Sequence, residues 1–131
     1  MKTAKIKRLE RVVSRNETFE VLGFVVQVLE GSGGCAWVQG VYKGMQVQAK
    51  IYGMPSEYGI GGGHVSKLWV AEDAVKRAVT VNYDRGWDVG EAREGIWRPL
   101  VERLDFFAAS EEFKKTVGYV DEQENMQGKV K

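Results

Sequence analysis

The sequence has few of the side chains on which small metalloproteins and many hydrolytic enzymes depend. Its 131 residues include one cysteine, Cys35, and one histidine, His64. One cysteine cannot form an intrachain disulfide, and a four-ligand zinc site needs more Cys and His side chains than this chain contains. We therefore expect a fold without disulfides, bound metal or cofactor, in a reducing, cytoplasmic location.

Long apolar runs are also missing, since no stretch approaches the roughly 20 residues that cross a bilayer. The first residues are basic but lack the apolar core and cleavage site of a signal peptide, so no membrane association is expected. Hydrophobic residues make up 44% and charged residues 28% of the chain. These are ordinary values for a single globular domain.

Basic side chains are concentrated at the start of the chain. Six of the 19 Lys and Arg residues lie within residues 1–15, where Glu10 is the only acidic residue, although the whole chain has a net charge of only +1. Such an arm could contact nucleic acid or an acidic protein, but many solvated helices are equally charged. Because the rest of the chain is mildly acidic, nucleic-acid binding is expected only through residues 1–15.

Residues 1–30 predict an N-terminal helical extension. Residues 3–13 carry apolar side chains at helical spacing, and a second helix is bounded by a capping box at residues 14–17 and by Gly31. The β-branched residues of the second segment, among them Val21 and Val28, leave a buried strand as the alternative. Residues 31–34, with the sequence GSGG, are interpreted as a flexible joint.

After residue 35 the pattern changes to the alternation of a half-buried sheet. Residues 36–42 and 45–52 flank Lys43-Gly44, a two-residue hairpin turn. Gln46, Gln48, Lys50 and Tyr52 are expected on the wet face of the second strand. Residues 53–63 form a glycine-rich loop, residues 65–70 and 77–84 two more strands, and residues 85–95 a loop.

A C-terminal helix is predicted from Pro99, which suits a first helical turn, with one more turn starting at Ser110. The expected fold is α+β: a four-stranded antiparallel β-meander packed against a C-terminal helix, with the N-terminal helical extension. The expected organisation is an extension at 1–30, a core domain at 36–118 and a flexible tail at 119–131. An exposed sheet edge makes a homodimer plausible.

The glycine-rich loop is the first of two candidate binding segments. Its glycines can turn backbone N–H groups toward an anion, and the following strand can add a hydroxyl and a positive charge. The spacing matches neither a Walker A loop nor a dinucleotide-binding fingerprint, and a structural crossover loop is the alternative. The candidate binding residues here are Tyr58, Gly61, Gly62, Ser66 and Lys67.

The second candidate segment is residues 82–88, with the sequence NYDRGWD. An arginine between two aspartates and two aromatic residues could bind a phosphate or acidic group while an indole stacks on a flat one. The same arrangement could instead fix a corner of the fold. The candidate binding residues are Tyr83, Asp84, Arg85, Trp87 and Asp88.

Catalytic signals are weak, and we expect a protein that is not an enzyme. Any histidine chemistry would rest on His64 and would need a carboxylate within about 3 Å of it. Asp84 and Asp88 could form an acid–base pair, but Arg85 would keep both ionised.

The two motifs, S-x-Y-G-I-x-G-G-x-V-S-K-L over residues 56–68 and the NYDRGWD segment, resemble a family of small uncharacterised proteins from Gram-positive bacteria and their phages. The likeness covers about residues 36–108 and leaves residues 1–30 and the tail outside. The family carries no established activity, so the resemblance implies no catalytic residues. It implies a small phage or mobile-element protein that acts by binding.

Two functions fit that implication. The first is a non-enzymatic protein that binds a host protein in the host cytoplasm, either as an anti-defence inhibitor, such as an anti-CRISPR protein, or as an adaptor. The second is a binder or sponge for a nucleotide or another small phosphorylated ligand, held by the glycine-rich loop and the NYDRGWD corner.

Overall fold

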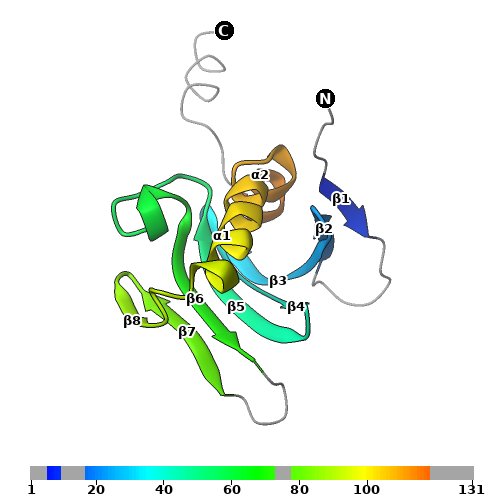
Figure 1. Cartoon of the computed structure of the whole chain (residues 1–131). Helices are drawn as coiled ribbons and strands as arrows, with labels where there is room; N and C mark the ends of the chain where they lie inside the picture. Colours follow the sequence, from blue (N-terminus) through cyan, green and yellow to red (C-terminus); the bar gives the residue numbers. More distant parts are fainter. Residues whose placement is uncertain (1–5, 10–16, 73–77, 119–131) are drawn as a thin grey trace, which may run out of the picture.

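The computed structural model describes residues 6–9, 17–72 and 78–118. There the chain forms an eight-stranded antiparallel sheet in which each strand pairs with the next, followed by two helices (Figure 1). The strands are β1 (Ile6–Leu9), β2 (Glu17–Val21), β3 (Phe24–Ser32), β4 (Cys35–Tyr42), β5 (Met45–Tyr52), β6 (Val65–Ala71), β7 (Val79–Asp84) and β8 (Trp87–Val89). A 3₁₀ turn, η1 (Ile60–Gly62), follows β5, and the helices are α1 (Glu94–Ala108) and α2 (Glu111–Val117).

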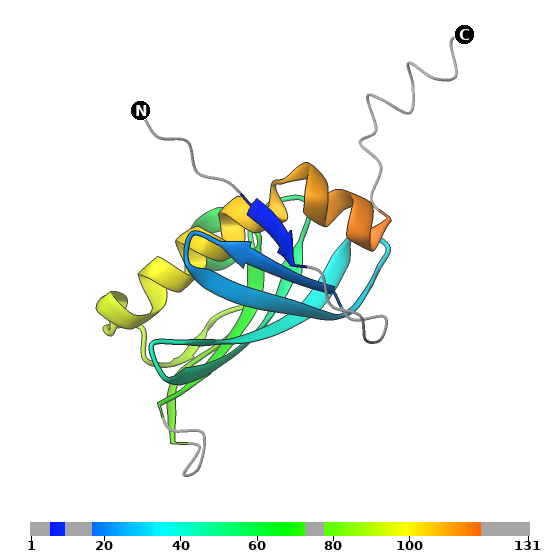
Figure 2. The same cartoon turned by 90° about the vertical axis from the view of Figure 1, so that its right-hand side faces the viewer.

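Both helices pack on one face of the curved sheet, which bends around them (Figures 1 and 2). Helix α1 contacts β2, β5 and β6, and α2 contacts β3. We call the face that carries the helices the inner face and the opposite one the outer face. Within the described ranges, neither helix covers the outer face.

The core lies between the inner face and the helices. The Phe107 ring of α1 lies 4.9 Å from the Phe19 ring of β2 and 5.2 Å from the Phe113 ring of α2, measured between ring centres, and all three side chains are fully buried. Aromatic pairs at these separations add stability beyond the area they bury. The strands that precede residue 36 therefore share one core with the rest of the sheet.

The predicted N-terminal helices are wrong wherever the structure describes this segment. Residues 6–9 form β1, and residues 17–32 form the hairpin of β2 and β3. Leu22 and Gly23 form the turn between the two strands. Their positive φ angles, 52° and 86°, are those of a two-residue hairpin turn. The β-branched residues, which had left a strand as the alternative, decide the structure because the sheet buries Val21, Val26 and Val28 on one face.

The four-stranded meander is confirmed as antiparallel and in sequential order, but it is half the size of the real sheet. The Lys43-Gly44 hairpin is confirmed, with both turn residues at positive φ. Residues 31–34 are not a joint: Gly31 and Ser32 belong to β3, and Gly33 and Gly34 form the turn into β4.

Two predictions near the C-terminus need correction. The loop predicted at 85–95 contains β8, because Arg85 adopts a φ of 61° and returns the chain along β7. Helix α1 begins at Glu94, more than one turn before the predicted start at Pro99, which therefore lies inside the helix. The second helix is confirmed, and its Ser110 cap accepts a hydrogen bond from the Phe113 amide at 3.1 Å.

Most of the predicted basic arm, the predicted turn between β6 and β7, and the predicted tail at 119–131 lie outside the described residues. Neither described helix has the length and apolar character needed to cross a membrane.

Candidate functional site

The outer face carries two rows of side chains that run across neighbouring strands. Cross-strand partners point to the same face of a sheet, so the register fixes which residues lie side by side. The first row, which we call the amide row, consists of Gln27, Gln39, Gln48, Trp69 and Asn82. The second, the lysine row, consists of Trp37, Lys50, Lys67 and Asp84.

The alternation along each strand explains why these side chains face outward. Trp37 lies between the buried Ala36 and Val38, and Trp69 lies between the buried Leu68 and Val70. The apolar neighbours occupy the inner face, so the two tryptophans stand on the outer face, where both remain half-buried. Two large aromatic side chains therefore stand on a sheet face that neither described helix covers.

Two lysines lie over one of these tryptophans. The Nζ atoms of Lys50 and Lys67 lie 5.9 Å and 5.8 Å from the centre of the Trp37 ring, and Lys50 also lies 5.6 Å from the Tyr52 ring. These are cation–π distances. A bulge in the pairing of β5 and β6, next to Lys50, sets the register that brings Lys50 opposite Lys67.

Carboxylates border this positive centre. Lys67 Nζ lies 3.6 Å from an Asp84 carboxylate oxygen, and the same oxygen lies 3.8 Å from Arg85 Nε. Asp84 and Arg85 are more than half exposed, so these pairs are weak and screened by solvent. The Asn82 amide donates a hydrogen bond of 3.3 Å to Asp88. The outer face thus has cations in its middle and carboxylates at its β7–β8 side.

The two rows surround a shallow hollow of about 420 Å³. Its size lies within the range of small-molecule pockets, although it is open to solvent on one side. The lining residues are Trp37, Gln48, Lys67, Leu68, Trp69, Asn82, Tyr83 and Asp84.

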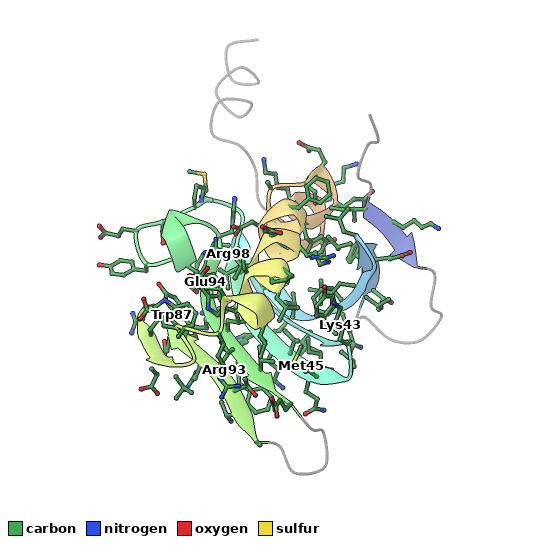
Figure 3. The ribbon with its side chains drawn as sticks, in the orientation of Figure 1. Lys43, Met45, Trp87, Arg93, Glu94 and Arg98 are labelled. Carbon is green, nitrogen blue, oxygen red and sulfur yellow. The ribbon has the colours of Figure 1, made fainter. Side chains whose placement is uncertain are left out.

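The predicted residues of the NYDRGWD corner are divided between the two faces. Lys67 pairs with Asp84 on the outer face, whereas Leu68 pairs with Tyr83 on the inner face. The Tyr83 ring lies 5.0 Å from the Trp87 ring, which lies 5.0 Å from the Trp97 ring of α1. Figure 3 shows Trp87 beside the start of α1, near Glu94 and Arg98. Trp87 therefore packs against the helix, on the face opposite to Lys67.

The glycine-rich loop is held to the sheet and helix by its own hydrogen bonds. The Tyr83 hydroxyl donates to the Tyr58 carbonyl at 2.8 Å, while the Tyr58 side chain is exposed. Gly61 and Gly62 are exposed at the 3₁₀ turn. Ser66 is buried: its hydroxyl donates to the Lys50 carbonyl at 3.4 Å and its carbonyl accepts from the Arg85 amide at 2.9 Å.

Asp105 of α1 anchors the end of this loop. Its carboxylate accepts a 2.9 Å hydrogen bond from the backbone amide of His64, not from the imidazole, whose Nδ1 lies 2.8 Å from the Tyr52 carbonyl oxygen. Burial raises the pKa of Asp105 above its usual value, and the hydrogen bond and charge of His64 oppose that rise. Desolvation likewise raises the pKa of Tyr83. Within the described residues, no group of three His, Cys, Asp or Glu side chains could hold a metal ion.

A sequence family matches the same part of the fold. The sequence pattern described as domain of unknown function (DUF7678) matches residues 36–105, from β4 into α1. The chain belongs to the DUF7678 family. The match covers both motifs, so it confirms that they mark an uncharacterised family. No curated protein and no solved structure matches the chain.

The DUF7678 region contains every residue of the lysine row and the hollow, whereas β1, β2 and β3 lie outside it. Alternation along β5 predicts Gln46, Gln48, Lys50 and Tyr52 on an open face, but the sequence-based candidate residues do not include Trp37 and Trp69. The signal that could have found them is a tryptophan between two small or aliphatic residues in a strand, because alternation then places it on the open face.

Proposed function

We propose that this protein is a non-enzymatic binding protein whose outer sheet face engages a host protein, as an anti-defence inhibitor of the anti-CRISPR kind or as an adaptor. The observation that carries the proposal is the pair of half-buried tryptophans, Trp37 and Trp69, on a face that neither described helix covers. Tryptophan is enriched among the residues that contribute most to protein–protein binding.

The charges of the outer face favour a protein partner over a nucleic acid. Nucleic-acid binding depends on neutralising many phosphates with Lys and Arg. Here the Asp84 carboxylate lies beside the cations of Lys67 and Arg85, Asp88 accepts a hydrogen bond from the neighbouring Asn82, and Glu30 lies opposite Trp37. Mixed charges with amide side chains around an aromatic centre are typical of protein interfaces, which have polar rims.

The proposed absence of catalysis is supported by the contacts of His64. The carboxylate of Asp105 accepts a hydrogen bond from the backbone amide of His64 and anchors a loop. The imidazole lies against a backbone carbonyl.

The test compares two matched double variants as baits in a lysate of the host bacterium. The outer-face variant carries Trp37→Ala and Lys67→Glu. The control variant carries Phe106→Ala and Arg98→Glu, which replace an exposed aromatic and an exposed cation of α1 in the same way. We expect a protein retained by the wild-type chain and by the control, and recovered at least about tenfold less with the outer-face variant. Equal recovery by all three baits contradicts the proposal.

Binding of a nucleotide or another small phosphorylated ligand is a second candidate, favoured by the hollow itself. Trp37 offers a flat surface, Lys67 a cation for a phosphate, and Gln48 and Asn82 amides that can pair with base edges. A thermal-shift scan against mono-, di- and cyclic nucleotides tests it. A ligand at about 100 times its dissociation constant adds roughly 2.7 kcal/mol of stability, and that gain should disappear in Lys67→Gln.

A further inference from the structure

The positively charged centre of the outer face lies over an aromatic ring, and this combination indicates which side chains of a protein partner could bind there. Lys50 and Lys67 both lie over the Trp37 ring. Lys67 is paired with Asp84, whereas Lys50 makes no ion pair within the described part of the chain. The middle of the face therefore has an ammonium group that is free of ion pairs among the described residues, while carboxylates lie on both sides of it, Glu30 opposite Trp37 on β3 and Asp84 with Asp88 toward β7 and β8.

The hollow beside this centre has an aromatic and amide lining. Trp37 and Trp69 come from β4 and β6, and Gln48 lies between them on β5. A volume of about 420 Å³ is large enough to receive a side chain of the partner together with part of its neighbours. Aromatic side chains gain from edge-to-face or offset contacts with tryptophan, so an aromatic anchor fits the lining.

We propose that the outer face binds an acidic segment of a partner protein, with an aromatic side chain of that segment in the hollow and neighbouring carboxylates against Lys50 and Lys67. This inference rests on the proposed function and specifies its partner. Carboxylates at these lysines would form charge-assisted hydrogen bonds while each ammonium keeps its contact with the indole. A continuous polyphosphate is disfavoured because Asp84 and Asp88 border the same cations.

The test uses fluorescently labelled polymers and measures the anisotropy of each during titration with the full chain. The probes are a copolymer of glutamate and tyrosine, a copolymer of lysine and tyrosine, polyglutamate, and oligothymidylate. We expect the glutamate–tyrosine copolymer to bind more tightly than the other three, because it alone combines carboxylates with aromatic anchors. Affinity should fall as salt is raised.

Variants then locate the binding. Lys50→Gln and Lys67→Gln should each weaken the glutamate–tyrosine copolymer about tenfold, and Trp37→Ala about 30-fold. Lys43→Gln and Arg98→Gln are matched controls, since each removes a cation that lies over an aromatic ring elsewhere, at 5.5 Å from Tyr42 and 5.0 Å from Trp97 (Figure 3). The controls should bind like the wild type, and thermal unfolding of every variant establishes that it is folded.

Three results overturn the inference. If polyglutamate binds as tightly as the glutamate–tyrosine copolymer, no aromatic anchor is needed. If oligothymidylate binds more tightly than the copolymer, the preferred partner is a single-stranded nucleic acid and not a protein. No binding of the copolymer refutes the acidic segment. The proposed function still holds without copolymer binding if the control bait retains a host protein that the outer-face bait does not retain. If neither the copolymer nor a host protein is retained, both proposals fail.

Discussion

The Nζ atom of Lys67 lies 5.8 Å from the centre of the Trp37 ring, although strand β5 runs between the strands that carry them. Lys50, on that intervening strand, approaches the same ring at 5.9 Å. The contact depends on the register of three strands, and it holds two long side chains against one indole. An arrangement ordered before binding loses less side-chain entropy when a partner arrives.

Replacing Lys67 should affect binding far more than stability. The lysine side chain is 35% exposed and its partner Asp84 is 57% exposed, so solvent screens their ion pair. We expect Lys67→Gln to lower the free energy of unfolding by no more than about 1 kcal/mol, measured by urea denaturation. A loss above about 2 kcal/mol would instead make Lys67 a structural residue.

Phe19→Ala tests whether the strands before the DUF7678 region complete the core. The ring is fully buried against Phe107, so we expect a loss of about 3–5 kcal/mol in the free energy of unfolding. Phe106→Ala is the control, because this side chain is 38% exposed and its removal should cost well under about 2 kcal/mol. Equal losses for the two variants would mean that β2 is not part of the core.

Replacing Asp105 by asparagine should change the stability relative to the wild type in a way that depends on pH. The pKa of Asp105 is raised in the fold above its ordinary 3.8, so its protonated form stabilises the protein. This contribution is fully present below the unfolded pKa and is lost as the pH rises through the folded pKa. Asparagine keeps an oxygen that can accept the His64 amide hydrogen bond without a buried charge.

The variant should therefore gain stability relative to the wild type between about pH 3.5 and pH 7. Urea unfolding of both proteins at the two pH values gives the difference between their free energies of unfolding. The titration of groups other than Asp105 contributes equally to both proteins and cancels in this difference. A variant that loses relative stability as the pH rises would show that the Asp105 charge is favourable.

Two glycine substitutions should have opposite effects. An added Cβ at Gly59 would lie 2.0 Å from the Gly63 carbonyl oxygen, so Gly59→Ala cannot be accommodated without moving the loop that Asp105 anchors. At Gly95, in the first turn of α1, an added Cβ meets nothing within 4 Å. Gly95→Ala should raise the free energy of unfolding by up to about 1 kcal/mol, whereas Gly59→Ala should lower it by more than that. Thermal melts compare the two directly, and a stabilised Gly59→Ala would refute the tight loop.

Local signals predicted those parts of the fold that depend on local chemistry. The Lys43-Gly44 turn joins two strands with clean alternation, and the Ser110 hydroxyl caps α2 by accepting a hydrogen bond from Phe113, only three residues along the chain. In segment 17–32 the local signals, a capping box at residues 14–17 and Gly31, favoured a helix, but the segment forms the β2–β3 hairpin. Its apolar residues fit both a helix and a buried hairpin, and the Leu22-Gly23 turn was hidden because leucine seldom adopts a positive φ.

The site could be predicted only in part, for a related reason. The wet face of β5 follows from alternation within one strand, so Gln48 and Lys50 were placed correctly. Which residues of other strands lie beside them depends on register, and the bulges in β5–β6 and β7–β8 pairing have no signature in the sequence. The compact NYDRGWD motif therefore looked like one site, although its Asp84 and Trp87 lie on opposite faces of the sheet.

The measurement that tests the central claim most directly is side-chain footprinting of the full chain alone and in complex with a host protein retained in the capture experiment. Hydroxyl-radical labelling followed by mass spectrometry reports each exposed aromatic residue separately. We predict that labelling of Trp37, Trp69 and Tyr52 falls in the complex while that of Phe106, on α1, stays unchanged. Protection of Phe106 with no change at Trp37 and Trp69 would contradict the account, because the partner would then occupy the helical side and leave the outer face free.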